Sequence, residues 1–187
     1  FPVHLAGQPT DMAGISEIAR EQNLAIIEDA SHALGASYRN GNTDCLIGSC
    51  TDSDMTIFSF HPVKSIAMGE GGAITTNNDP LAKRLKRLRS HGIERSALAF
   101  KNYDLAFTKN LKANPWYYEM QNLVYNYSMT ALQTALGIAQ LKKIAVSGSL
   151  HDPMIEFISF DMADINRLFE VANNKEDRVI NLSLIQI

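Results

Sequence analysis

The 187-residue sequence has little of what marks several classes of protein. It has only two cysteines, Cys45 and Cys50, and their number and spacing fit neither a disulfide framework nor a close pair of metal ligands. No apolar run approaches the roughly 20 residues of a membrane-spanning helix, and no basic-then-apolar leader opens the chain. The formal net charge is only -3, which gives no field that attracts nucleic acid or anionic membranes. We therefore expect a cytoplasmic protein with no metal site, no nucleic-acid partner and no membrane partner.

The chain has enough apolar content for one substantial core, because 45% of its residues are hydrophobic,. It begins at Phe1, inside what looks like a strand, so we expect it to be a fragment of a longer protein.

A strand, a helix and a second strand at the start of the chain indicate a parallel βαβ unit. Strands are predicted at 1–5, 25–27, 55–60 and 73–76, and helices at about 11–23, 80–89 and 129–144, with 95–125 mostly loop; a helix at 163–173 and a strand at 179–187 have no clear place,.

A first polar cluster, residues 28–32, directly follows the predicted strand at 25–27. Ligands of open α/β sheets bind beyond the carboxyl ends of strands, which makes Asp29 a candidate ligand-binding carboxylate. Taken alone, the same residues could equally do nothing more than cap the next turn.

A second cluster ends the apolar run from residue 55 and contains Lys64. A lysine close to a strand end can be partly desolvated, and its amine is then suited to Schiff-base chemistry. An ordinary solvated lysine is the alternative, because most lysines are exposed.

The loop after Lys64 offers two weaker signals. Gly69, Gly71 and Gly72 allow a close approach to a ligand, but a tight turn between two strands explains them as well. His61 stands beside a proline at a strand end and is expected to be a structural hydrogen-bonding residue rather than a general base.

The basic run on the helix at 80–89 is interpreted as a solvated face and not as a nucleic-acid site.

Taken together, three motifs resemble the DegT/DnrJ/EryC1/StrS family of nucleotide-sugar aminotransferases. They are residues 28–36, 58–64 and 69–73, which occur in the family's order and spacing. The resemblance extends to about residue 144 through 2–7, 89–93, 115–119 and 125–127. It implies an α/β fold of the aspartate-aminotransferase type (fold type I), with a mostly parallel sheet flanked by helices.

The resemblance also implies a cofactor, pyridoxal 5'-phosphate (PLP), and a role for each matching residue. Lys64 would form the Schiff base with PLP and shuttle protons, and Asp29 would pair with the pyridinium nitrogen. His32 would lie near the ring, Ser59 would bind the phosphate, and Asn126 would reach the phosphate of a partner subunit. The substrates would be an amino donor, probably glutamate, and a 4-keto nucleotide sugar used in surface polysaccharide or glycan biosynthesis. The role of Asn126 in the family also implies a homodimer with a shared active site.

The resemblance assigns residues 1–144 to the central part of the PLP-binding large domain and leaves 145–187 as an unassigned tail. Ala67 and Met68 replace two threonines of the family, Ser128 replaces an arginine, and Ala131 replaces an aspartate. The segment before Phe1 and the small C-terminal domain of the family have no counterpart. We therefore expect weak PLP binding and little turnover from this chain by itself. The alternative to an enzyme is a truncated, non-catalytic remnant or cofactor-binding module.

Overall fold

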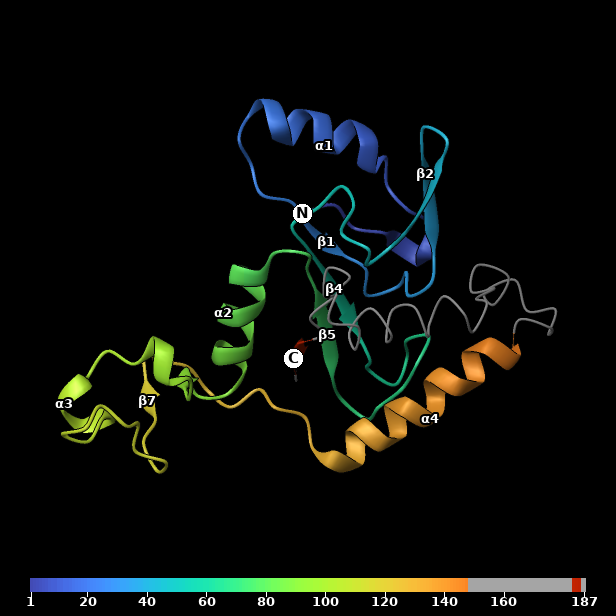
Figure 1. The fold of residues 1–187 in the computed structure, drawn as a ribbon. Coiled ribbons are helices and arrows are strands. Elements are labelled where there is room, and N and C mark those ends of the chain that lie inside the picture. The colour runs from blue at the N-terminus through green and yellow to red at the C-terminus, as the bar shows by residue number, and fades with distance from the viewer. Residues whose placement is uncertain (148–182, 186–187) are drawn as a thin grey trace.

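A computed structural model describes residues 1–147 and 183–185 of the chain. These residues form an α/β fold in which helices flank a four-stranded sheet (Figure 1). The fold class predicted from the sequence is confirmed. The elements are η1 Leu5–Gly7, α1 Met12–Glu21, β1 Ile27–Asp29, β2 Ser37–Asn40, β3 Thr43–Leu46, β4 Met55–Ser59, β5 Gly72–Thr75, α2 Asp79–Arg89, β6 Ile93–Glu94, η2 Ala97–Ala99, α3 Tyr103–Ala106, β7 Glu119–Met120, α4 Ala131–Ser147 and β8 Ser183–Ile185.

The sheet has the strand order β1-β4-β5-β8 and is mixed. Strands β1 and β4 are parallel, whereas β5 is antiparallel to both of its neighbours. Within the described residues, the sheet thus has a smaller share of parallel strand pairs than the mostly parallel sheet that we expected. The strand expected at 1–5 is reduced to one parallel bridge between Val3 and Asp29, followed by the 3-10 helix η1. The bridge, α1 and β1 still form the predicted βαβ unit.

The two helices that flank the strands begin at side-chain caps. The Asp11 carboxylate accepts a hydrogen bond from the Gly14 amide at 3.1 Å, which starts α1 as predicted,. Helix α2 is capped by Asn78, whose side chain accepts from the Leu81 amide at 3.0 Å. The Asp79-Pro80 dipeptide, which favours a cap at Asp79, lies in the first turn instead,.

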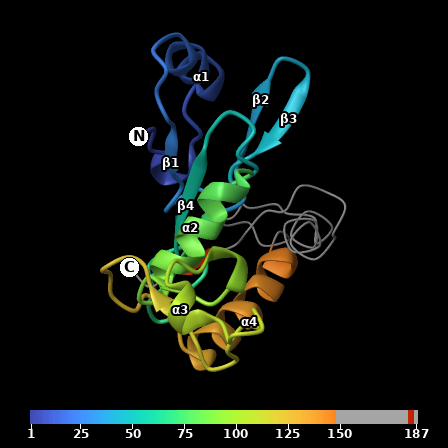
Figure 2. The ribbon, with the colours of Figure 1, turned by 60° about the vertical axis from the view of Figure 1, so that its left-hand side comes forward.

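The β2-β3 hairpin was missed in the sequence analysis. Gly41 and the next residue connect the two strands, and Asn40 pairs with Thr43 in the register. Its sequence signal was the Gly41-Asn42 dipeptide, which favours two-residue hairpin turns,. In Figure 2 the hairpin extends beside α1 at one end of the molecule. The strand predicted at 25–27 is also displaced, to Ile27–Asp29.

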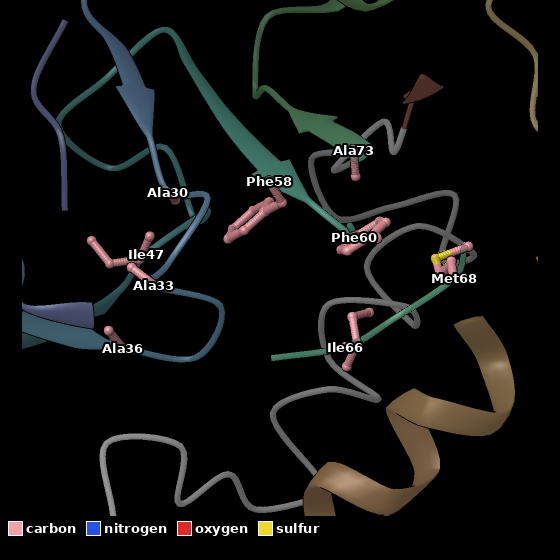
Figure 3. Close-up of a cluster of buried hydrophobic side chains, with 9 residues drawn as sticks. All are labelled: Ala30, Ala33, Ala36, Ile47, Phe58, Phe60, Ile66, Met68 and Ala73. Carbon is pink, nitrogen blue, oxygen red and sulfur yellow. The ribbon is translucent and has the colours of Figure 1, made fainter. Parts of the chain in front are cut away.

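The main core lies at the junction of β1, β4 and the loop between β4 and β5. Figure 3 shows Phe58 and Phe60 at its centre, with Ile66 and Met68 on the side toward α4. Met68 is buried, and a side chain at Gly137 of α4 would overlap its end. The other buried members are Ala30, Ala33, Ala36, Ile47 and Ala73.

Residues 95–127 form an extension that projects away from the sheet (Figure 1). It is mostly loop, as predicted, with α3 and β7 as short elements. Of the predictions near the C-terminus, the helix at 163–173 lies outside the described residues, and the strand at 179–187 is present in part as β8. Among the described helices, none has the length and apolar character needed to cross a membrane.

Candidate active site

Two candidate residues lie where adjacent parallel strands end. Asp29 is the last residue of β1, and Ser59 is the last residue of β4. The register pairs Asp29 with Ile57, and the Ala30 amide donates to the Ile57 carbonyl at 2.8 Å. Because both strands run in the same direction, their polar ends meet at one edge of the sheet. This edge is where the sequence predicted a ligand.

The Asp29 carboxylate is fixed and charged. It accepts a hydrogen bond from the Ser31 amide at 3.0 Å. Hydrogen bonding from the Ser31 side chain is the largest cause that lowers the pKa of Asp29 below its usual value. Partial desolvation opposes it, and the Ser31 amide and the nearby charges of His32 and Lys64 lower the pKa further,. The fold therefore brings together Asp29, His32 and Lys64, which the sequence places up to 35 positions apart.

Lys64 lies in a turn that begins at the end of β4. Its amide donates to the His61 carbonyl at 2.9 Å, and the His61 amide donates to the Ser59 hydroxyl oxygen at 3.4 Å. The Val63 amide donates to His61 Nδ1 at 3.3 Å. His61 thus supports the turn, in agreement with the structural interpretation of this residue. Lys64 is half-buried, so it is not an ordinary fully solvated lysine.

The glycines after Lys64 return the chain to the sheet as a turn. Gly69 has a φ of +83°, a conformation that favours glycine,. The Gly71 carbonyl accepts from the Phe60 amide at 2.8 Å, and a side chain at Gly71 would overlap the Met129 sulfur. Space and backbone geometry therefore account for these glycines, as the turn interpretation predicted.

Asn126 lies apart from this cluster. It forms an antiparallel bridge with Ser90 after α2, and its side-chain oxygen accepts from the Ser128 amide at 2.9 Å. Within the described part of the chain, no hydrogen bond links it to Asp29 or Lys64. Its assignment to a partner's site stays a prediction.

Sequence reasoning missed a buried polar pair, His4 and Glu28. His4 Nε2 lies 2.8 Å from Glu28 Oε2, and neither residue is more than 2% exposed. Glu28 was considered only as a helix or turn cap. Its position one residue before Asp29 and the alternation of strand side chains could have predicted that it points into the protein.

The basic run on α2 is only partly the solvated face that we expected. Lys83 and Arg84 are exposed. Arg87 is half-buried, and its guanidinium contacts Asn122 at 3.0 Å, Gln121 at 3.1 Å and Glu94 at 3.5 Å. Arg87 therefore connects α2 to the extension.

A lysine, a carboxylate and a hydroxyl, here at adjacent strand ends of an α/β sheet, are groups that lysine-dependent cofactor enzymes use. A model of the DegT/DnrJ/EryC1/StrS aminotransferase family matches residues 1–187. The chain belongs to this family.

Individual relatives agree with this assignment. The chain is 45% identical over 146 residues to "Uncharacterized protein MJ1066" of Methanocaldococcus jannaschii, covering 78% of this chain and 34% of that protein. It is 40% identical over 142 residues to UDP-4-amino-4,6-dideoxy-N-acetyl-beta-L-altrosamine transaminase of Campylobacter jejuni. That match covers 76% of this chain and 32% of that protein. An aminotransferase structure from Psychrobacter cryohalolentis matches with a TM-score of 0.64 and 28% identity, covering 91% of this chain and 37% of that one. The chain thus spans about a third of the length of the curated relatives.

The residues at this edge fit the chemistry of PLP. PLP has an aldehyde, a ring nitrogen that is cationic when protonated, and a phosphate. Lys64 offers an amine, Asp29 offers an ionised carboxylate, and Ser59 offers a hydroxyl, all at the same edge of the sheet,. The donor set therefore matches the three reactive groups of the cofactor.

Proposed function

We propose that this chain contributes the PLP-binding part of an aminotransferase that moves an amino group from glutamate to a 4-keto nucleotide sugar. The observation that carries the proposal is the placement of Asp29 and Ser59 at the ends of the adjacent parallel strands β1 and β4, with Lys64 in the turn that follows β4. Membership of a sugar-aminotransferase family supports it. The Campylobacter jejuni relative is a transaminase of a UDP-linked amino sugar, which supports a nucleotide-sugar substrate.

Each residue has a distinct task in this proposal. When bound, PLP supplies an electron-accepting ring for the amino transfer. The Lys64 amine holds the cofactor and, once free, moves a proton at the reacting carbon of the substrate. Asp29 holds the proton on the ring nitrogen. His32 orients the ring from the side, and the Ser59 hydroxyl donates to the phosphate.

The proposed enzyme is a homodimer in which Asn126 binds the phosphate held by the partner subunit. Two observations support this. Asn126 is exposed and belongs to a segment apart from Lys64. The apolar side chains near it are also unusually exposed, with Leu123 at 91% and Tyr125 at 78%. Clustered apolar exposure marks surfaces that another protein covers.

The experiment is to trap the cofactor on its lysine. The protein is incubated with PLP, reduced with borohydride, digested and analysed by mass spectrometry. The expected adduct is on Lys64. An adduct on Lys83 or Lys109, with none on Lys64, would overturn the assignment. Amino transfer from glutamate is then measured with UDP-linked and GDP-linked 4-keto sugars in a version of the protein extended to the length of its relatives, and turnover of neither sugar would contradict the proposed substrate class.

A further inference from the structure

Directly beneath the candidate site lies a buried polar network that the proposed chemistry does not use. The Glu28 carboxylate accepts from His4 Nε2 at 2.8 Å, from the Thr56 hydroxyl at 2.7 Å and from the Ser53 hydroxyl. His4 is 0% exposed and Glu28 is 2% exposed. Buried charges are costly unless they are paired, so this carboxylate requires its partners.

The contacts define the protonation of the pair. The Thr10 amide donates to His4 Nδ1 at 3.1 Å, so Nδ1 carries no proton and Nε2 must donate to Glu28,. Burial acts to raise the pKa of Glu28, but hydrogen bonds from His4, Ser53 and Thr56 outweigh it and lower that pKa,. The pair is therefore a neutral imidazole that donates to an ionised carboxylate.

The same segment that carries His4 is fastened to two candidate cofactor-binding residues. The Asp29 amide donates to the Pro2 carbonyl at 2.9 Å, and the His4 amide donates to the Asp29 carbonyl at 3.0 Å. The Ala6 amide approaches His32 Nδ1 at 3.4 Å. Gly7, with a φ of +85°, passes so close to the His32 carbonyl that a side chain there would lie 3.3 Å from its oxygen.

We propose that His4 and Glu28 are positioning residues, which hold the segment 2–7 against β1 and thereby fix Asp29 and His32 in the orientation that binds PLP. Neither residue touches the cofactor in this arrangement. Glu28 acts from the interior side of β1, and Asp29 follows it on the opposite face of the strand. The inference rests on the proposed function and adds a second layer of residues to the site.

The hydrogen bonds of Glu28 indicate which substitutions would disturb the position of Asp29 with little change in the packing of the side chain. Glu28→Gln keeps the shape of the side chain and an oxygen that can accept from Thr56. Its amide group would however face the His4 Nε2 proton, donor against donor. His4 can relieve the clash by changing tautomer, and it then loses its bond from the Thr10 amide,. If the amide turns over instead, the Thr56 and Ser53 hydroxyls must accept where they donated before,. Ser53→Ala is a milder variant, because it removes one donor to Glu28 from a half-buried position.

Two measurements test the proposal. The first is hydrogen exchange of the PLP-free protein, which reports on the amides of His4 and Asp29. The second uses PLP labelled with 15N in the ring, whose chemical shift reports whether the ring nitrogen is protonated. Asp29→Asn supplies the reference shift for a site that cannot hold this proton. Glu94→Gln is the matched control, because the Glu94 carboxylate also accepts from a nitrogen of another side chain, Arg87, but lies in β6.

We expect Glu28→Gln to accelerate exchange at His4 and Asp29 by about tenfold or more and to weaken PLP binding by about tenfold, as the loss of a buried charged hydrogen bond implies. The 15N shift should move part of the way toward that of Asp29→Asn. Ser53→Ala should move each quantity in the same direction by a smaller factor, and Glu94→Gln should move none. Wild-type exchange and 15N shift in Glu28→Gln would overturn the inference, as would equal changes in Glu94→Gln. If Glu28→Gln does not fold, unchanged exchange and PLP binding in Ser53→Ala would overturn it.

The outcomes also separate this inference from the proposed function. If the unsubstituted protein binds no PLP, the proposed function fails. Hydrogen exchange then still decides whether His4 and Glu28 hold Asp29 in place. If the unsubstituted protein binds PLP and the variants behave like it, the positioning role alone fails.

Discussion

The strand-end region around Asp29 and the extension at 95–127 are stabilised in opposite ways. At the strand ends, the polar contacts lie beneath the surface, where His4 and Glu28 are shielded from water. In the extension, large side chains are exposed, with Leu98 at 98% and Trp116 at 67%. Its main polar contact, the Glu119 carboxylate, accepts from the amides of Lys101 and Asn102 in a part-exposed position.

This difference shows which part of the proposed site the chain organises by itself. Buried hydrogen bonds are protected from competition by water, so the strand ends can hold the proposed PLP-binding groups in place before the cofactor binds. Segments with few buried apolar contacts open at low free energy. We therefore expect the extension to respond to mild changes that leave the strand ends intact.

The largest effect should come from removing the amine at the strand ends. We expect Lys64→Ala to abolish covalent PLP binding and, in a version of the protein extended to the length of its relatives, to lower turnover by about 10³-fold or more, since both the nucleophile and the proton carrier are lost. Absorption spectra and the amino-transfer assay measure the two effects. Lys83→Ala, at an exposed position of α2, is the matched control. A loss in Lys83→Ala as large as that in Lys64→Ala would rule out a special role for Lys64.

A smaller loss should follow when only the charge of the strand-end carboxylate is removed. Asp29→Asn keeps the size of the side chain but cannot hold a proton on the ring nitrogen. In the extended protein we expect turnover to fall on the order of 10²-fold, while some of the PLP binding remains. A PLP titration beside the activity assay measures the separation. Unchanged turnover would remove Asp29 from the mechanism.

The sequence predicted the parts of the molecule whose signals are local. Helices α1 and α2 were found because capping side chains and apolar periodicity lie within a few residues of one another. Asp29 and Lys64 were singled out because each follows an apolar strand, whereas Ser59 was named only through the family resemblance. The family resemblance then joined them into one site.

The parts that were missed depend on distant partners. The role of His4 requires Glu28, 24 positions away, and Arg87 meets Asn122, 35 positions away. Periodicity contains no information about such pairs. The β2-β3 hairpin was missed because its residues are mostly exposed or half-buried, which gave no clear apolar alternation,.

A third prediction tests how tightly the region beside the strand ends is packed. Gly48 has a φ of +95°, and a side chain there would lie 2.7 Å from the Phe58 ring. We expect Gly48→Ala to lower the free energy of unfolding by ~2–4 kcal/mol through backbone strain and overpacking. Gly41→Ala is the matched control, since Gly41 also has a positive φ, +59°, but has open space around it. Its cost should be about 1 kcal/mol. Urea unfolding measures both, and equal losses would contradict tight packing at Phe58.

The smallest effect that we predict concerns the order of the extension as the pH falls. Partial desolvation raises the pKa of Glu119, but hydrogen bonds from the Asn102 and Lys101 amides, Gln121 and Tyr117 outweigh it and lower that pKa to about 2,. Because this folded-state pKa lies below the ordinary value of 4.5, the stabilising contribution of Glu119 is present above about pH 4.5 and is lost as the pH falls toward 2. The extension should therefore loosen over this acidic range.

Trp116, the single tryptophan of the chain, reports on this change, because its ring lies 5.8 Å from that of Tyr117. We expect the Trp116 fluorescence of the wild-type protein to change as the pH is lowered from about 4.5 to 2, ahead of the far-UV circular dichroism signal of the helices. In Glu119→Gln the fluorescence at neutral pH should already resemble the acidic form, and its change with pH should be reduced. Glu21→Gln, at the exposed end of α1, should behave like the wild type. A full acidic transition in Glu119→Gln would mean that Glu119 does not hold the extension. Simultaneous changes in fluorescence and circular dichroism in the wild-type protein would mean that the two regions do not differ in stability.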